Sequence, residues 1–129
     1  MIALTSIAIG GAIGALLRYG LSGWISSIWG GAIYGGTLTV NLIGCLLIGL
    51  VFGLFEQSVI HPAFKGLTVI GILGAFTTFS SFGLESFILI RHQHWRDLAT
   101  NIILNNVGGL LLVYLGYMLA LHITAFLHR

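Results

Sequence analysis

The centre of the chain reads Gly71-Ile-Leu-Gly74-Ala-Phe76-Thr77-Thr78-Phe79-Ser80-Ser81-Phe82. This stretch places hydroxyls, aromatic rings and glycines inside a mostly apolar run, residues 67–90, which is long enough to cross a hydrocarbon core of roughly 30 Å. We expect the helix to break at Gly74, and a broken helix at membrane depth frees backbone carbonyls that need a partner, often a cation. The stretch therefore predicts a membrane helix that is broken near its middle beside a buried monovalent cation.

The composition supports a membrane environment. Of 129 residues, 57% are hydrophobic and 6% are charged, whereas soluble domains have about 25% charged residues. A soluble domain of this size cannot bury so much apolar surface, but helices in a bilayer only need to satisfy their own backbone hydrogen bonds. The net charge of +2 comes from residues too sparse to form a nucleic-acid-binding surface.

Four apolar stretches are long enough to span a bilayer. They cover residues 2–21, 34–55, 67–90 and 98–121. Trp24, Trp29 and Trp95 fall in the links between them, where aromatic residues anchor a protein at the membrane surface. The sequence therefore predicts an all-α membrane protein with four transmembrane helices, forming one domain over residues 1–129.

The basic residues are almost evenly divided between the two sides of the membrane. With an even number of spans, Lys65 and Arg129 lie on one side, and Arg18, Arg91 and Arg96 lie on the other. Lys and Arg in short loops set the orientation of a membrane protein, so this near balance gives little preference for either orientation. This balance suggests the hypothesis of dual topology, in which the chain inserts in both orientations. The alternative is that the balance arose by chance among only five basic residues.

Glycines recur four residues apart in two of the expected spans. Gly10 and Gly14 form one pair, and Gly49 and Gly53 form another. Small residues at this spacing allow helix backbones to approach closely in lipid. These glycines therefore predict tight helix packing, within one subunit or between subunits.

Aromatic and hydroxyl residues alternate in the central stretch. Phe76, Phe79 and Phe82 recur every three residues, so in a helix they would share one side, and a packed aromatic stripe is the simpler interpretation. The residues between the rings are Thr77, Thr78, Ser80 and Ser81. Ring edges carry positive potential and hydroxyls donate hydrogen bonds, so together they can also hold a small anion.

Asparagines lie inside two of the expected spans. Asn41 is in the middle of the second span, and Asn101 and Asn105 are four residues apart in the fourth, on one face with Gly109. Amides are costly at this depth unless they are paired. Hydrogen bonding between helices is one explanation and a water-lined polar track is the other, and the sequence leaves both open.

Two ionisable residues within the spans are functional candidates. Glu85 is well inside the third span, and Arg18 is near the end of the first, where its positive charge would attract anions. Glu85 can alternatively reach water or pair with an arginine. The sequence contains no nucleophile–base arrangement, phosphate loop or cofactor motif, so we do not expect an enzyme.

Three motifs resemble those of a known family in order and spacing. They are Gly10-Gly-Ala-Ile-Gly-Ala-Leu-Leu-Arg-Tyr19, Gly36-Thr-Leu-Thr-Val-Asn-Leu-Ile-Gly44 and the central stretch from Gly71 to Phe82. Over essentially its whole length the chain resembles the Fluc, or CrcB, family of bacterial fluoride channels.

The resemblance implies an antiparallel, dual-topology homodimer whose third helices are broken where the two subunits cross. It also implies a structural sodium ion on the dimer axis, held by the backbone carbonyls of Gly74 and Thr77 of each subunit. Phe79 and Phe82 would present ring edges to fluoride in two parallel pores, with Asn41 beside them.

The remaining expected pore residues are less directly implied by the resemblance. Candidates for a polar track are Thr37, Ser81, Asn101 and Asn105, and candidates for a vestibule or modulating charge are Arg18 and Glu85. The implied activity is passive export of fluoride from the cytoplasm across the bacterial inner membrane, with fluoride, lipid and a second copy of the chain as partners. The rejection of larger chloride would follow from a narrow bore.

Two other functions remain to be considered. Small proton-coupled multidrug exporters also have four helices and dual topology, but they need a titratable acid in the substrate pocket, typically in the first span, and residues 2–21 contain none. A non-transporting structural subunit would explain the glycines but not the hydroxyls and amides at mid-membrane.

Overall fold

The computed structural model describes residues 2–29 and 32–127, and these residues form helices and turns without a strand. Four helical units within them are long and apolar enough to cross a membrane: Ala3–Ile28, Gly35–Glu56, Pro62–Arg91 and Trp95–Leu127. The prediction of an all-α protein with four membrane-spanning helices is confirmed. The fold is that of a multi-pass membrane protein.

The third and fourth crossings are composite. In chain order the elements are α1 (Ile2–Ile28), α2 (Gly35–Glu56), the 3₁₀-helix η1 (Pro62–Phe64), the π-helix η2 (Gly66–Leu73), α3 (Gly74–Phe76), α4 (Phe79–Arg91), α5 (Trp95–Ile103), the π-helix η3 (Leu104–Gly108) and α6 (Gly109–Leu127). The third crossing therefore contains η1, η2, α3 and α4, and the fourth contains α5, η3 and α6.

Several helices extend beyond the apolar stretches that predicted them. α1 continues to Ile28, so Trp24 lies on a helix and not in a link, whereas Trp95 is the first residue of α5. Hydropathy marks where lipid contact ends, but backbone hydrogen bonding continues through polar residues until a turn stops it. Trp24 and Trp95 are exposed, as expected of side chains at the membrane surface.

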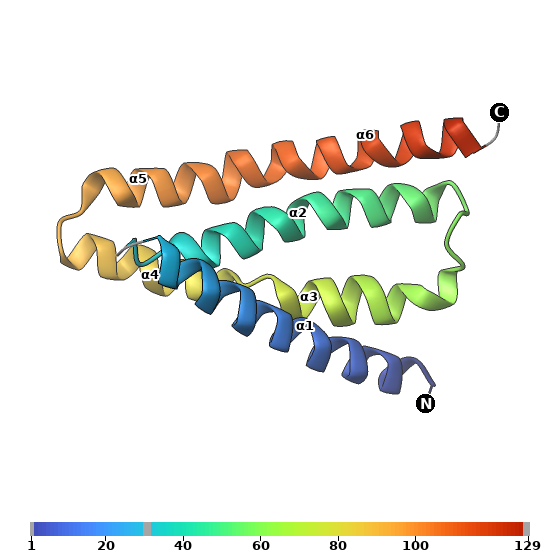
Figure 1. Cartoon of the computed structure of the whole chain (residues 1–129), viewed down its shortest axis with the longest axis horizontal. Helices are drawn as coiled ribbons and strands as arrows, with labels where there is room; N and C mark the ends of the chain where they lie inside the picture. Colours follow the sequence, from blue (N-terminus) through green and yellow to red (C-terminus); the bar gives the residue numbers. More distant parts are fainter. Residues whose placement is uncertain (1, 30–31, 128–129) are drawn as a thin grey trace.

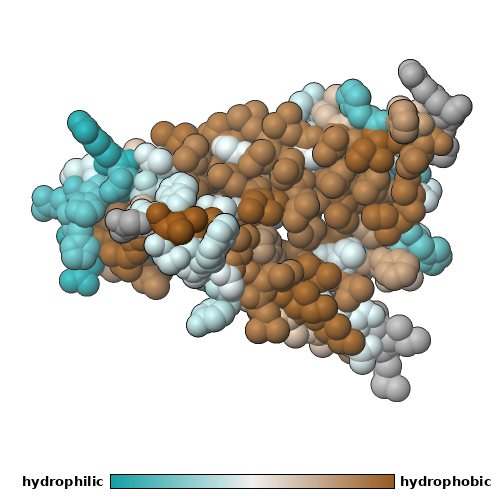
Figure 2. Space-filling view, in the orientation of Figure 1, coloured by the Kyte–Doolittle hydropathy of each residue, from teal (hydrophilic) through white to brown (hydrophobic). Residues whose placement is uncertain are grey.

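The crossings run up and down, and α1 passes obliquely across the third crossing (Figure 1), in contact with α2, η2 and α3. The start of α1, the link between α2 and η1, and the end of α6 lie at one end, and Lys65 lies between η1 and η2 at the same end. The turn between α4 and α5 lies at the opposite end, where Arg91 closes α4 and Arg96 follows the start of α5. Figure 2 shows an apolar band between these ends, with hydrophilic residues gathered most densely over the α4–α5 turn. Arg129 lies outside the described residues.

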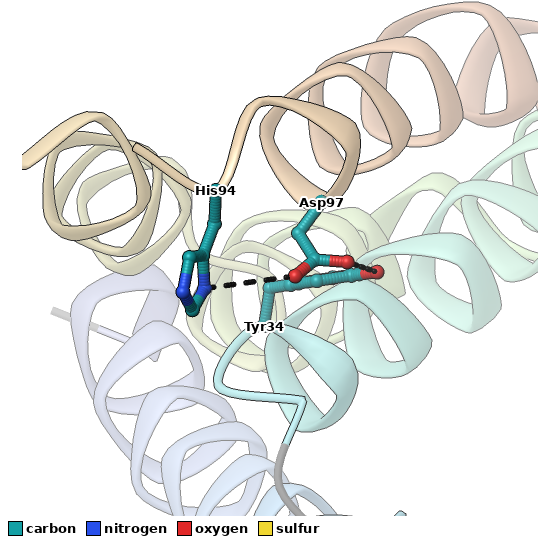
Figure 3. A network of polar contacts seen from close by, with 3 residues as sticks. All are labelled: Tyr34, His94 and Asp97. Carbon is teal, nitrogen blue, oxygen red and sulfur yellow. Dashed lines mark hydrogen bonds and ion pairs between the residues drawn. The ribbon is translucent and has the colours of Figure 1, made fainter. Parts of the chain in front are cut away.

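Beside the α4–α5 turn, polar contacts join the start of α2 to the start of α5 (Figure 3). The Tyr34 hydroxyl donates to Asp97 Oδ1 at 3.5 Å, and His94 Nδ1 lies 3.8 Å from Asp97 Oδ2. Burial, followed by the charge and hydrogen bond of Asp97, raises the pKa of Tyr34 above its ordinary value. The Tyr34 side chain also packs with Leu38 and Leu89 in a small apolar core.

The break in the third crossing falls at two threonines. Thr77 (φ −84°, ψ 157°) and Thr78 (φ −150°, ψ 118°) are extended, whereas Gly74 (φ −64°, ψ −35°) is helical. The predicted break is confirmed, but its predicted position at Gly74 is wrong. The physical reason is that a side chain, and not a missing Cβ, redirects the backbone: the Thr77 N–H still donates to the Leu73 carbonyl as in a helix, but the Thr78 N–H donates to the Asn41 side chain.

Glycines bring helix backbones into contact along two pairs of elements. α2 packs along α6, and α1 packs along η2. A Cβ on Gly49 would overlap the Val113 carbonyl oxygen, and one on Gly116 would overlap the Leu46 carbonyl oxygen. Gly14 meets the Ile72 carbonyl in the same way. The predicted tight packing is confirmed, and these contacts lie within one chain.

We expect Gly116→Ala to lower the free energy of unfolding by about 1–3 kcal/mol, because a methyl group there must displace the backbone of α2. Gly20→Ala is the matched control, since a Cβ at Gly20 meets no atom within 4 Å and alanine favours the helix by about 1 kcal/mol. Thermal unfolding of the purified protein in detergent measures both. Equal shifts in the two variants would contradict this packing.

Candidate functional site

Asn41 of α2 holds the break in the third crossing. Its Oδ1 accepts the Thr78 N–H at 2.8 Å, and its Nδ2 donates to the Thr78 carbonyl at 3.1 Å. One amide thus satisfies both backbone groups of a residue that has left the helix, in a setting where unsatisfied groups are expensive. The position of the break is therefore set by a side chain that is distant in the sequence.

Thr78 also begins the helix that follows the break. Its Oγ1 accepts the Ser81 N–H at 3.3 Å, which caps α4. The same hydroxyl lies 3.2 Å from Ser80 Oγ and 3.1 Å from Ser81 Oγ. A hydroxyl cluster therefore surrounds the N-terminus of α4, where helix geometry leaves amide N–H groups directed toward the break and a partial positive charge.

Two backbone carbonyls lose their helical donors at the break. In an uninterrupted helix the Gly74 carbonyl would accept from the Thr78 N–H, and the Thr77 carbonyl would accept from the Ser81 N–H. Here the first N–H donates to Asn41 and the second donates to the Thr78 hydroxyl. Carbonyl oxygens released in this way are ligands of the type that hard cations prefer.

A cavity of about 260 Å³ lies beside the break. We name it the Phe cavity; its lining residues are Asn41, Gly44, Cys45, Ile48, Leu73, Thr77, Thr78, Phe79, Phe82, Asn105 and Asn106. Phe79 and Phe82 have ring centroids 5.3 Å apart and planes inclined by 53°. Phe82 is 9% exposed, whereas Phe79 is 79% exposed. The cavity thus combines aromatic rings with amides and hydroxyls.

Phe76 does not share a side with these two rings. The break lies between Phe76 and Phe79, so the helical spacing that predicted one aromatic stripe does not apply. Phe76 is buried and lines a different, apolar cavity next to Leu16 and Leu17 of α1. The predicted three-ring stripe is wrong, and a two-ring pair remains.

A second cavity, of about 550 Å³, lies on the α1 side of the break. We name it the Arg cavity; its lining residues are Ala15, Arg18, Tyr19, Ser22, Gly23, Thr37, Thr78, Ser80 and Ser81. Thr78 lines both cavities. The candidate residues predicted from the sequence therefore divide: Asn41, Phe79, Phe82 and Asn105 meet at the Phe cavity, and Arg18, Thr37 and Ser81 meet at the Arg cavity.

A chain of amides connects three of the crossings. Asn41 Nδ2 donates to Asn105 Oδ1 at 2.9 Å, Asn105 Nδ2 donates to Asn101 Oδ1 at 2.8 Å, and Asn101 Nδ2 donates to Ser86 Oγ at 3.1 Å. Asn101 is fully buried and lines neither the Phe cavity nor the Arg cavity. Hydrogen bonding between helices, the first of the two explanations, is present, and Asn105 also reaches the Phe cavity.

Glu85 pairs with a hydroxyl. Its Oε1 accepts from the Thr37 hydroxyl at 2.5 Å, and its Oε2 is buried without a hydrogen-bond partner among the described residues. Arg18 is half-buried and forms no ion pair within residues 2–29 and 32–127. Thr37 joins Glu85 to the Arg cavity, since this hydroxyl residue lines that cavity while it donates to the acid.

Several residues of the Phe cavity were not predicted from the sequence. Gly44, Cys45, Ile48 and Leu73 carry no signal apart from small size or apolarity, but Asn106 is polar and directly follows Asn105. The four-residue spacing of an α-helix pointed to Asn101 and Asn105 only. The adjacent pair of amides was the available signal for Asn106.

The fold and the two cavities define a class: small multi-pass helical membrane proteins with a polar site at a broken helix. Residues 5–117 match the family described as "CrcB-like protein, Camphor Resistance (CrcB)". The chain belongs to this CrcB family.

Individual relatives are similar over nearly the full chain. The protein from Shewanella frigidimarina is 44% identical over 113 residues, which cover 88% of this chain and 91% of the relative. The proteins from Shewanella oneidensis and Shewanella loihica are 41% and 42% identical over 116 residues, which cover 90% of this chain and 94% of each relative. All three carry the name "Fluoride-specific ion channel FluC".

We expect Thr78→Val to lower the free energy of unfolding by about 1 kcal/mol, because valine has nearly the same shape but cannot cap α4. Thr78→Ser retains the capping oxygen and serves as the control. Thermal unfolding in detergent distinguishes them. A valine variant as stable as the serine variant would show that the cap does not hold the start of α4.

Proposed function

We propose that the protein is a fluoride-selective ion channel that exports fluoride passively from the cytoplasm across the bacterial inner membrane. The observation that carries the proposal is the Phe cavity, where aromatic rings, amides and hydroxyls meet at a broken helix, in a chain whose relatives are named fluoride-specific ion channels. Its effect in the cell would be to lower the internal fluoride concentration and its toxicity.

The chemistry of the Phe cavity suits fluoride. Fluoride is small and strongly hydrated, so a pore must replace its water with hydrogen-bond donors and positive ring edges. Phe79 and Phe82 both line the cavity, and an anion there would be held at their ring edges, because the ring faces carry negative potential. The amides, hydroxyls and ring edges that line this cavity would replace the water of fluoride, and a narrow bore along the pore would reject the larger chloride.

The Arg cavity would supply the approach to this site. Arg18 would raise the local concentration of anions, and the hydroxyls of Thr37 and Ser81 would offer donors between Arg18 and the break. Glu85, bonded to Thr37, would limit anion occupancy by its own charge or take part in the hydrogen-bond network when neutral. Fluoride would then flow outward, driven partly by the inside-negative membrane potential.

The proposed assembly is a homodimer of two antiparallel subunits. Phe79 lines the Phe cavity and lies beside the break, in the middle of the third crossing, and yet it is 79% exposed. A second copy that completes the cavity would cover this ring. The near balance of basic residues between the two ends supports insertion in both orientations.

The donor set at the break fits a structural sodium ion. The carbonyls of Gly74 and Thr77 have both lost their helical donors, and oxygen ligands suit a hard monovalent cation. Two such carbonyls from each of two subunits would hold the ion, whose positive charge would favour anions nearby.

The exporter alternative has less support. α1 contains no acidic residue, and Glu85 lines neither the Phe cavity nor the Arg cavity. Neither cavity at the break therefore contains the acid that proton-coupled export requires in its substrate pocket.

We expect liposomes containing the purified protein to lose fluoride rapidly and to retain chloride. Phe82→Ile removes one ring edge at similar bulk, and we expect it to slow fluoride efflux by about tenfold or more, equivalent to about 1.4 kcal/mol of barrier. A fluoride electrode and a chloride electrode give the two rates. Absence of fluoride efflux from a well-folded dimer would contradict the channel function.

We expect replacement of sodium by N-methyl-D-glucamine to reduce fluoride efflux and to lower the melting temperature in detergent, because a cation bound only to the folded state stabilises it. Thr77→Ser is the control, since it retains the backbone carbonyl and should retain the sodium dependence. Melting temperatures and efflux rates that do not change with sodium would contradict the proposed ion.

A further inference from the structure

Two of the three amides that line the Phe cavity have no hydrogen left for a ligand. The Asn41 amide nitrogen donates to the Thr78 carbonyl and to Asn105 Oδ1. The Asn105 amide nitrogen donates to the main-chain carbonyl of Asn101 at 3.0 Å and to its side-chain oxygen at 2.8 Å. Each NH₂ group has two hydrogens, and each has two acceptors. Asn41 and Asn105 are therefore committed to holding the break and the fourth crossing together.

Asn106 is the third amide, and it retains a free donor. Its Nδ2 donates to the Ile102 carbonyl at 2.8 Å, one turn back on the same crossing. Over residues 2–29 and 32–127 the structure gives Asn106 no other hydrogen bond, and its side chain is exposed. One amide hydrogen and the side-chain oxygen thus remain available on the wall of the Phe cavity.

The local helix geometry explains why neighbouring residues reach the same cavity. Asn105 and Asn106 both lie in the π-helix η3, Leu104–Gly108. A π-helix has a wider turn than an α-helix, so successive side chains are separated by a smaller angle, and such segments occur frequently at functional sites. The wider turn lets Asn105 bond to Asn41 while Asn106 still lines the Phe cavity.

An exposed amide at this depth needs a polar partner. Asn106 follows Asn105, which reaches the break in the middle of the third crossing, so lipid hydrocarbon on its free side would leave it unsatisfied. A partially dehydrated anion beside the Phe79 and Phe82 rings would accept the free hydrogen.

We propose that Asn106 is a further fluoride-contacting residue that donates its free amide hydrogen to the ion in the Phe cavity and thereby determines rate and selectivity. This inference rests on the proposed function. Asn41 and Asn105 maintain the geometry, and Asn106 provides the amide contact with fluoride.

Fluoride and chloride efflux from liposomes tests the proposal with three variants. Asn106→Leu has similar volume without a donor, and Asn106→Ser retains a hydroxyl donor. Thr124→Val is the matched control on the same crossing, because the Thr124 hydroxyl is buried and donates only to carbonyls of its own helix, those of Ala120 and Leu121. Dimer content and melting temperature are measured on the same preparations.

We expect Asn106→Leu to slow fluoride efflux by about tenfold or more, with unchanged dimer content, and to reduce the ratio of fluoride to chloride efflux. Asn106→Ser should stay within about threefold of the unmodified protein, and Thr124→Val should match it.

Wild-type rate and selectivity in the leucine variant would overturn the proposal. A lower rate that accompanies loss of the dimer would also overturn it, because Asn106 would then be a contact between subunits. Lack of efflux from the unmodified protein would instead remove the proposed function, and this inference with it.

Discussion

The bidentate pairing of the Asn41 side chain with the Thr78 backbone is the interaction on which the rest of the site depends. An extended residue at mid-membrane exposes an N–H and a carbonyl that lipid cannot satisfy, and Asn41 pairs with both. Because the Thr78 N–H donates to Asn41, the Gly74 carbonyl loses its helical donor. Because Thr78 is extended, its hydroxyl can cap α4. The carbonyl pair, the hydroxyl cluster and the position of the Phe79–Phe82 pair all follow.

The amides of the fourth crossing extend this arrangement through the bundle. Asn105 accepts from Asn41 and donates to Asn101, which donates to Ser86 of α4, so the break and the helix that follows it are tied to the fourth crossing. Chains of hydrogen bonds polarise one another in a low-dielectric interior, and a partly satisfied network there is costly. A polar network of this kind favours one geometry for the site over alternatives of similar packing.

Much of this fold could be predicted from the sequence, because apolar length and glycine spacing report directly on lipid contact and close helix packing. The position of the break could not be predicted, since Gly74 offers local flexibility while the decisive bonds come from Asn41, distant in the chain. Phe76 was misplaced for the same reason, because the break interrupts the helical period. Asn106 was missed because the wider turn of η3 departs from the α-helical spacing that selected Asn101 and Asn105.

The reciprocal contacts between α2 and α6 restrict how this molecule can move. The Val113 carbonyl packs against Gly49 and the Leu46 carbonyl packs against Gly116. The backbone of each helix therefore packs against a glycine of the other helix at two points along their length. Sliding by one residue would push a side chain into a main-chain oxygen. The two helices are therefore locked against sliding along each other, so their relative position is fixed more firmly than lipid-facing packing alone would fix it.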